Sequence, residues 1–310
     1  MALRAHTRGG PEVLVYESMP RPAPGDGELL VAVHAAGITF AELTWPQTWV
    51  AGGVDRTPVV PSHEFSGVVA AVAGDVTRVA VGDEVFGLVP FDRDGAAAEY
   101  VSVPADHAAA KPATVSHVVA AAAVLPALTA WEALVDHAAV KPGDRVLVHG
   151  SAGGVGALIT QLGTALGVNV TGTVRSPDDM AHVRSLGAEH VIDAGSEPVD
   201  VQSGVFDVAI DAAGTNTPEF LFAAVRRGGL LITLQVPPLQ EMADKYGIRA
   251  MFFIVTAKQE ALSRMADMID AGNLHIGVAA TFPLAEGRAA YESGATRRRR
   301  PGKTVLVVRD

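Results

Sequence analysis

Apolar and polar positions divide the chain into two parts with different patterns. Up to about residue 118, short apolar runs such as 28–36 and 59–74 are broken by Gly and Pro, which predicts a compact β-rich domain. Beyond it, alanine and leucine dominate and short apolar runs alternate with stretches of helical spacing. The runs predicted as strands are 145–150, 169–174, 190–193, 205–211, 228–234 and 249–255. This alternation predicts an α/β fold with a doubly wound parallel sheet.

The C-terminal segment has a mixed pattern. A helix is predicted over residues 258–271, and an apolar run over 303–308 predicts a last strand. A completed doubly wound sheet of about six strands has no place for that strand, so we expect the segment to rejoin the first domain. The predicted domains are residues 1–122 with 257–310, and residues 123–256.

A glycine-rich turn follows the strand predicted at 145–150. Residues 151–156 match the pattern G-x-G-x-x-G, with serine at the first glycine. Backbone N–H groups and the positive end of the following helix face an anion at such a turn, and missing side chains let a phosphate approach. The residues expected to hold a dinucleotide's pyrophosphate are Ser151, Ala152, Gly153, Gly154 and Val155. A turn that needs glycine for backbone reasons alone is the alternative.

Composition narrows the classes of function. A chain of 310 residues is long enough for two domains with their own cores, and its net charge of −10 argues against general nucleic-acid binding. There is no cysteine, which excludes disulfides, thiolate nucleophiles and cysteine-ligated zinc. The N-terminus lacks the apolar stretch of a signal peptide, and there is no uninterrupted apolar run of membrane-spanning length. We therefore expect a cytoplasmic protein without a membrane partner.

Further motifs occur in order along almost the whole chain. They are GGPEVL at 9–14, GDV at 74–76 followed by VGDEV at 81–85, LTAW at 128–131, HGSAGGVG at 149–156 and GKTVL at 302–306. Together they resemble the medium-chain dehydrogenase/reductase superfamily, and within it the zinc-independent quinone oxidoreductase-like branch. The resemblance implies a GroES-like catalytic domain, a Rossmann domain, a cleft between them, and hydride transfer from NADPH to a quinone or an activated alkene.

The adjacent His63 and Glu64 look like the zinc-binding signature of alcohol dehydrogenases. Catalytic zinc needs three protein ligands with a fourth position open. By the resemblance, Thr39 stands where those relatives have a cysteine ligand, and Leu125, which cannot coordinate, stands at the third position. We therefore expect no metal. His63 is then a hydrogen-bonded structural residue or a wall of the active site.

The end of the second predicted Rossmann strand bears on the choice of cofactor. NAD-preferring Rossmann domains place an acidic side chain there, and this chain has Val174. Arg175 and Ser176 follow, offering a guanidinium and a hydroxyl to a 2′-phosphate, so NADP(H) is predicted. The alternative is a solvated Arg175. Whether the arginine run 297–300 reaches the cofactor stays open, since such runs are typical of solvated loops.

The resemblance implies the remaining site residues. Thr39, Glu42 and His63 are candidate proton donors, with water as the alternative. Trp45 and Trp49 are candidate walls for a flat substrate, although large aromatics also serve as ordinary core. The further residues expected to line the cofactor are Phe40, Thr129, Ala213, Gly214, Leu234, Gln235, Val236 and Phe253.

Three functions are compatible with these features. The first is an NADPH-dependent reductase of quinones or α,β-unsaturated ketones, with a small-molecule substrate and no metal. The second is an enoyl reductase acting on a polyketide or acyl intermediate. The third is a nucleotide-binding protein with little catalysis, which the altered loop at 39–42 keeps open. A homodimer is also expected, because the exposed N–H and C=O groups of an apolar edge strand at 249–255 invite pairing with a second copy.

Overall fold

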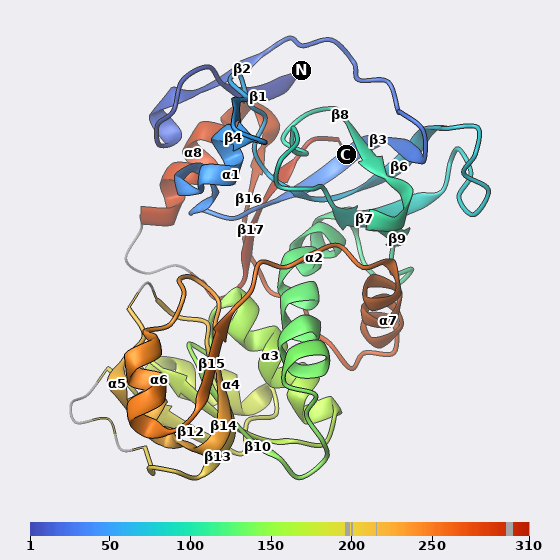
Figure 1. Cartoon of the computed structure of the whole chain (residues 1–310). Helices are drawn as coiled ribbons and strands as arrows, with labels where there is room; N and C mark the ends of the chain where they lie inside the picture. Colours follow the sequence, from blue (N-terminus) through green and yellow to red (C-terminus); the bar gives the residue numbers. More distant parts are fainter. Residues whose placement is uncertain (196–198, 200, 215, 296–299, 310) are drawn as a thin grey trace. The chain divides into compact units, whose positions relative to one another are not determined.

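The structure is a computed structural model that describes residues 1–195, 199, 201–214, 216–295 and 300–309 (Figure 1). The chain divides into two compact units: unit 1 comprises Met1–Leu125 and Thr256–Asp310, and unit 2 comprises Pro126–Val255. The domain boundaries expected from the sequence lie at 122/123 and 256/257. The assignment of catalysis to one unit and nucleotide binding to the other remains a prediction.

Unit 1 is built on a seven-stranded sheet in the order β16-β17-β3-β6-β7-β9, with β8 also paired to β3. Its strands are β3 (Glu28–Ile38), β6 (Glu64–Val72), β7 (Glu84–Leu88), β8 (Tyr100–Pro104), β9 (Ala108–Ala110), β16 (Val278–Pro283) and β17 (Lys303–Val307). The antiparallel pairing of β17 with β3 aligns Thr304 with Ile38. The expectation that the C-terminal strand rejoins the first domain is therefore confirmed.

Smaller elements complete unit 1. Two short antiparallel strand pairs are separate from the main sheet: β1 (Ala2–Ala5) with β2 (Leu14–Glu17), and β4 (Val50–Ala51) with β5 (Val54–Asp55). The unit also contains the helices α1 (Pro46–Trp49), α7 (Gln259–Asp270) and α8 (Gly287–Glu292). The core contains the fully buried rings of Phe65 on β6 and Phe86 on β7, and the strand residues on either side of each ring are buried as well.

Unit 2 contains a six-stranded sheet in the order β12-β11-β10-β13-β14-β15, and every pair of strands in it is parallel. The strands are β10 (Arg145–His149), β11 (Asn169–Val174), β12 (His190–Asp193), β13 (Phe206–Asp211), β14 (Val225–Thr233) and β15 (Arg249–Phe252). This is the strand order of a Rossmann fold, which confirms the predicted doubly wound sheet. The last strand is shorter than the predicted 249–255, because its partner β14 ends at Thr233, opposite Phe252.

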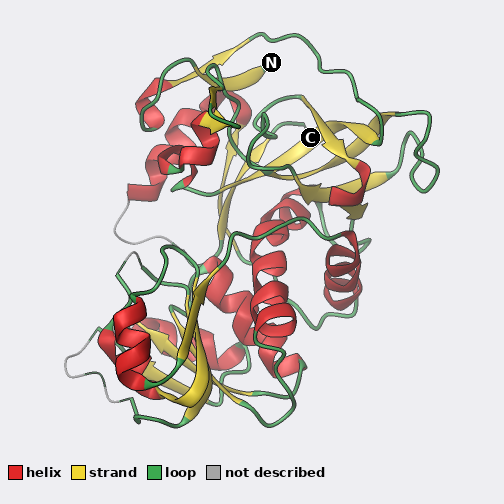
Figure 2. Cartoon of the chain, viewed as in Figure 1, coloured by secondary structure: helices red, strands yellow, loops and turns green. Residues whose placement is uncertain are grey.

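Short helices pack against the strands of this sheet (Figure 2). They are α3 (Gly154–Ala165), α4 (Met180–Ser185), α5 (Glu219–Ala224) and α6 (Gln240–Tyr246). Helix α3 packs on β10 and β11 and α4 on β12, whereas α5 packs on β13 and β14 and α6 on β15. Crossovers that leave the first strand in opposite directions place their helices on opposite faces, so the strand ends between β10 and β13 are open.

Helix α2 (His117–Trp131) and the π-helical turn Glu132–His137 form one helical stretch of 21 residues. Its length and composition would allow it to cross a membrane, although polar and charged residues interrupt the apolar run. In the most apolar 18-residue segment of this stretch, 78% is buried. This burial is that of a core helix in a globular protein.

Candidate active site

The predicted dinucleotide-binding residues of unit 2 gather at the carboxyl edge of the parallel sheet. They follow the ends of neighbouring strands: 150–155 after β10, 175–176 after β11, 213–214 after β13, 234–236 after β14 and Phe253 after β15. The strand order changes direction between β10 and β13, and ligands of open α/β sheets bind outside the carboxyl ends at that point.

The turn after β10 depends on glycine at two positions. Gly150 has a positive φ of 82°, and a Cβ added to Gly156 would lie 2.2 Å from the Gly150 carbonyl oxygen, so both positions require glycine. Helix α3 begins at Gly154 without a side-chain cap, and the N–H groups of a first helical turn have no partner inside the helix. These N–H groups and the positive helix end fit a pyrophosphate.

Ser151 supports this turn from inside. Its hydroxyl donates to the Val148 carbonyl oxygen at 2.8 Å and its N–H donates to the Thr173 carbonyl oxygen at 3.0 Å. The side chain is fully buried beneath Gly172, where a Cβ would come within 2.6 Å of the serine oxygen. Both donors of Ser151 are thus used within the unit, so the candidate donors to a phosphate are N–H groups of the residues that follow it.

Arg175 lies exposed directly after β11, whereas Val174 is buried. Within the part of the chain that the structure describes, no carboxylate forms an ion pair with Arg175. Ser176 accepts a hydrogen bond from the Asp178 N–H at 3.3 Å, so its hydroxyl caps the short helix that follows. Burial lowers the pKa of His149 at the end of β10; a nearby Asp211 carboxylate opposes this, and the Arg175 cation adds to it. The positive charge of Arg175 therefore affects His149, a group at the carboxyl edge of the unit 2 sheet.

Asp211, at the end of β13, positions the loops on this edge and was missed by sequence reasoning. Its Oδ1 accepts from the Ala213 N–H at 3.1 Å, and its backbone oxygen accepts from the Leu234 N–H at 3.1 Å. The side chain is buried, and none of the described residues hydrogen-bonds to Oδ2. The sequence offered one signal for this role, namely an acidic residue at the end of a buried apolar strand.

Three more predicted cofactor residues differ in their surroundings. The Phe253 ring lies against His137, with ring centroids 4.6 Å apart. Thr129 is a buried residue of helix α2. Phe40 belongs to unit 1, where a Cβ added to Gly294 would come within 2.4 Å of its ring, so that glycine lets the ring pack.

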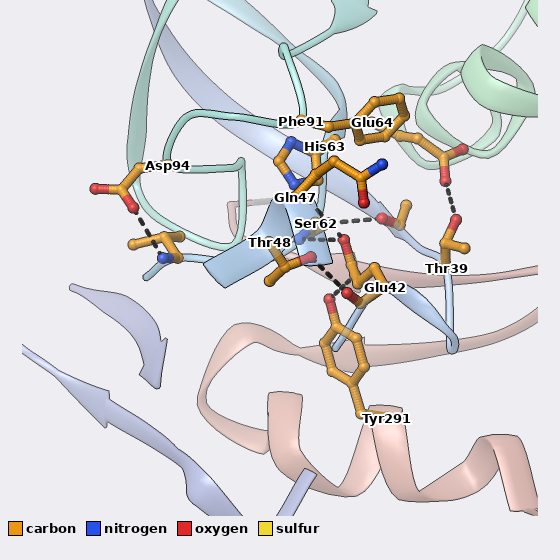
Figure 3. Close-up of polar contacts among 12 residues, drawn as sticks. Thr39, Glu42, Gln47, Thr48, Ser62, His63, Glu64, Phe91, Asp94 and Tyr291 are labelled. Atoms are coloured by element: carbon orange, nitrogen blue, oxygen red, sulfur yellow. Dashed lines mark hydrogen bonds and ion pairs between the residues drawn. The ribbon is translucent and has the colours of Figure 1, made fainter. Parts of the chain in front are cut away.

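In unit 1, Thr39 belongs to a cluster that sequence reasoning did not assemble. Lys303 Nζ lies 2.5 Å from Glu64 Oε1 and 3.1 Å from Thr39 Oγ1. Thr39 donates to the same carboxylate oxygen at 3.2 Å (Figure 3). The Leu125 N–H donates to Glu64 Oε2 at 3.2 Å. Gly37 faces Glu64 across β3 and β6, and a Cβ there would lie 3.0 Å from the carboxyl group. The cluster thus depends on four separate segments of the chain: the end of β3, the start of β6, helix α2 and the start of β17.

Glu42 lies at the centre of a second, deeply buried network (Figure 3). One carboxyl oxygen accepts from the Tyr291 hydroxyl, and the other accepts from the Ser62 N–H at 3.0 Å. Burial raises the pKa of Glu42 to about 7, against the opposing effect of these two hydrogen bonds. His63 Nε2 lies 4.0 Å from Glu42, and burial lowers the pKa of His63 to about 4. Between about pH 4 and about pH 7, the side chains of Glu42 and His63 are therefore both neutral.

The predicted aromatic walls separate into two environments. The Trp45 ring meets Phe91 edge-on at 5.5 Å, and Phe91 in turn meets the His63 ring at 5.0 Å. Trp45 is partly exposed, so it remains a candidate wall. Trp49 is 5% exposed within the hydrophobic core, and its indole N–H donates to the Leu43 carbonyl oxygen at 2.9 Å. Trp49 therefore serves as core.

The positions that matched zinc ligands form no set of donors. Among the described residues, no group of three His, Asp or Glu side chains could hold a metal ion. The Leu125 backbone and the Thr39 hydroxyl both bind Glu64, and the Lys303 ammonium already supplies a positive charge there.

Comparisons with known proteins place these observations in a family. A family model described as an alcohol dehydrogenase GroES-like domain matches residues 25–113, and one described as a zinc-binding dehydrogenase matches residues 186–306. The chain is 31% identical to a quinone oxidoreductase of Pongo abelii, over 99% of this chain and 97% of that protein. It is 29% identical to a 2-haloacrylate reductase of a Burkholderia species, over 94% of each. A structure of Escherichia coli quinone oxidoreductase complexed with NADPH is similar with a TM-score of 0.85, at 25% identity over 99% of both chains.

Proposed function

The chain belongs to the medium-chain dehydrogenase/reductase superfamily, in its quinone oxidoreductase-like branch, and we propose that it reduces a quinone or an α,β-unsaturated ketone with NADPH. The fold is that of this superfamily, a GroES-like unit and a Rossmann unit, and the chain is an oxidoreductase of this class. The observation that carries the finer proposal is the composition of the carboxyl edge of unit 2. Helix α3 begins there without a side-chain cap, Arg175 is exposed, and position 174 is a valine where NAD-preferring domains have an acidic residue.

The bound cofactor would supply a hydride. The N–H groups of Gly154 and Val155 at the start of α3 would hold its pyrophosphate, because they have no partner within the helix. The Gly153 N–H is used inside the turn, where it donates to the Gly150 carbonyl oxygen at 3.0 Å. Arg175 would hold the 2′-phosphate through a charge-assisted contact. The loops at 213–214 and 234–236, fixed by Asp211, would line the rest of the nucleotide together with Phe253.

The reaction is proposed to need no metal. A zinc ion with an open catalytic position takes three protein ligands, and His63 is the one imidazole among the three positions that match them. The Thr39 hydroxyl and the Leu125 N–H both donate to Glu64, and the Lys303 ammonium places a positive charge beside the same carboxylate. A second cation there would meet electrostatic repulsion.

Unit 1 is proposed to bind the substrate. Trp45 offers a partly exposed ring for a flat acceptor, and Thr39 offers a partly exposed hydroxyl to a carbonyl oxygen. Glu42 and His63 stay in the buried network behind these residues, where they would orient the loop and need not meet the substrate.

The test is steady-state oxidation of NADPH and NADH by the purified protein with a panel of acceptors. The panel contains 1,4-naphthoquinone, 2-cyclohexenone and a bulky enoyl thioester. Saturable NADPH oxidation with the quinone or the simple enone supports the proposal. Turnover of the thioester alone would favour an enoyl reductase of a biosynthetic pathway. Nucleotide binding without oxidation of NADPH across the panel would refute catalysis and favour a nucleotide-binding protein.

A further inference from the structure

A lysine is built into unit 1 beside the hydroxyl proposed to meet the substrate. Lys303 is the first residue of β17, and the pairing of β17 with β3 brings it to the end of β3, where Thr39 follows. Its ammonium donates to Glu64 at 2.5 Å and to Thr39 Oγ1 at 3.1 Å. Its side chain is 12% exposed, compared with 2% for Glu64. Lys303 therefore has access to solvent, and Glu64 has almost none.

These distances rank the hydrogen bonds in the cluster. The short charge-assisted bond from Lys303 satisfies Glu64 Oε1, which leaves the 3.2 Å bond from the Thr39 hydroxyl as the weaker of the two. That hydroxyl can rotate toward another acceptor while its oxygen continues to accept from Lys303. A hydroxyl that accepts from an ammonium is polarised toward donating its own proton.

Resting on the function proposed above, we propose that Lys303 supplies, through Thr39, the proton that completes the reduction of an enone. Addition of the hydride from NADPH to the β-carbon leaves an enolate with its negative charge on oxygen. The Thr39 O–H bond breaks as its proton moves to the enolate oxygen, and an N–H bond of the Lys303 ammonium breaks as that proton moves to Thr39 Oγ1. The product of this step is an enol, which tautomerises to the saturated ketone by exchanging protons with water. Lys303 is left as a neutral amine and takes a proton from water, because its side chain is 12% exposed.

The other candidate donors are less suited to this step. Both oxygens of Glu42 are occupied by Tyr291 and the Ser62 N–H in a site that is 1% exposed. His63 is buried, and its pKa of about 4 leaves it without a proton to give at neutral pH. Thr39 is the catalytic residue in this scheme, and Lys303 is the positioning and proton-supplying residue behind it.

The experiment exchanges lysine for a cation that does not release its proton. Lys303→Arg keeps the positive charge and the donors to Glu64, but a guanidinium stays protonated in proteins. We expect kcat to fall by about 100-fold, in the range that general acid catalysis contributes, with the Kd of NADPH within about a fewfold of wild type. Thr39→Val, which is nearly isosteric, should lower kcat by a similar factor. The double variant should lose no more than either single one, since the two residues act as one unit.

Lys111 provides the matched control. It is another buried lysine of unit 1, with 6% of its side chain exposed and an ion pair to Glu84 at 3.3 Å. Lys111→Arg should leave kcat within about twofold of wild type, because this pair is separate from the proposed site.

The outcomes separate this relay from the function on which it rests. If wild type turns over no acceptor in the panel, the proposed function is refuted and the relay with it. If wild type is active and Lys303→Arg retains its kcat, the relay alone is refuted, and Lys303 is a structural ion-pair partner. Losses that multiply in the double variant, to about 10,000-fold, would also overturn it, because independent effects add as free energies.

Discussion

Replacing Glu42 by glutamine should remove a pH-dependent loss of stability from unit 1. Glu42 is 1% exposed, and burial raises its pKa to about 7 from an ordinary 4.5. Between these values the unfolded chain ionises this carboxyl group while the folded chain keeps it protonated, so the free energy of unfolding falls as the pH rises. The difference of 2.5 corresponds to a loss on the order of 3 kcal/mol that is complete by about pH 8.

The His63 contribution to stability has the opposite dependence on pH. Its pKa is lowered to about 4 from 6.5, so the unfolded chain binds a proton in this range that the folded chain does not. Stability linked to His63 is therefore lost as the pH falls below about 6.5. The two effects partly cancel in wild type. A comparison of wild type with Glu42→Gln isolates the glutamate, because both proteins retain His63.

The assay is urea unfolding at 25 °C, repeated at steps between about pH 4.5 and pH 8. A Trp131→Phe background leaves Trp45 and Trp49 as the fluorophores, and both belong to unit 1. Glu42→Gln should gain on its parent steadily as the pH rises, up to the order of 3 kcal/mol. Glu286→Gln, at an exposed position of the same unit, is the control and should show a constant difference. Parallel curves for Glu42→Gln and its parent would refute the claim that burial keeps this carboxyl group protonated.

Four further outcomes are expected. Arg175→Ala should weaken NADPH binding by about tenfold to a hundredfold and leave NADH within a fewfold, since a charge-assisted phosphate contact is worth about 1.5–3 kcal/mol; equal weakening of both at fixed ionic strength would contradict this. Gly156→Ala should abolish detectable nucleotide binding and lower the Tm, because its Cβ would lie 2.2 Å from the Gly150 oxygen, and titration of NADPH fluorescence measures it. Prolonged chelation should leave turnover unchanged, with well under one zinc per chain by elemental analysis. Light scattering should give a dimer at micromolar concentration through the edge strand β15, and a monomer would end that expectation.

Local patterns predicted much of the fold. Parallel strands that are buried on both faces appear as short apolar runs, and their order followed from a fold with few alternatives once the glycine turn was placed. The residues predicted to face the nucleotide follow strand ends, so finding the strands also placed Arg175 at the carboxyl edge of the unit 2 sheet. Ser151 is the exception, because a pattern match cannot show that its hydroxyl and N–H are both used within the unit.

The networks of unit 1 were less predictable from the sequence, because they join segments that are distant in the chain. Lys303 and Thr39 are separated by 264 residues, and Tyr291 and Glu42 by 249, and no periodicity relates such positions. The terminal GKTVL motif contained Lys303, but its neighbours were unknown until β17 paired with β3.

The sequence alone determined which side chains were available: a threonine, two glutamates, a histidine and no cysteine in the positions of an expected active site. The tertiary structure decided their chemical states. Glu42 is raised in pKa because its site excludes water, and Glu64 meets a lysine brought from the end of the chain. Burial and long-range pairing are properties of the packed chain, so two glutamates that look alike in the sequence have different surroundings in the fold.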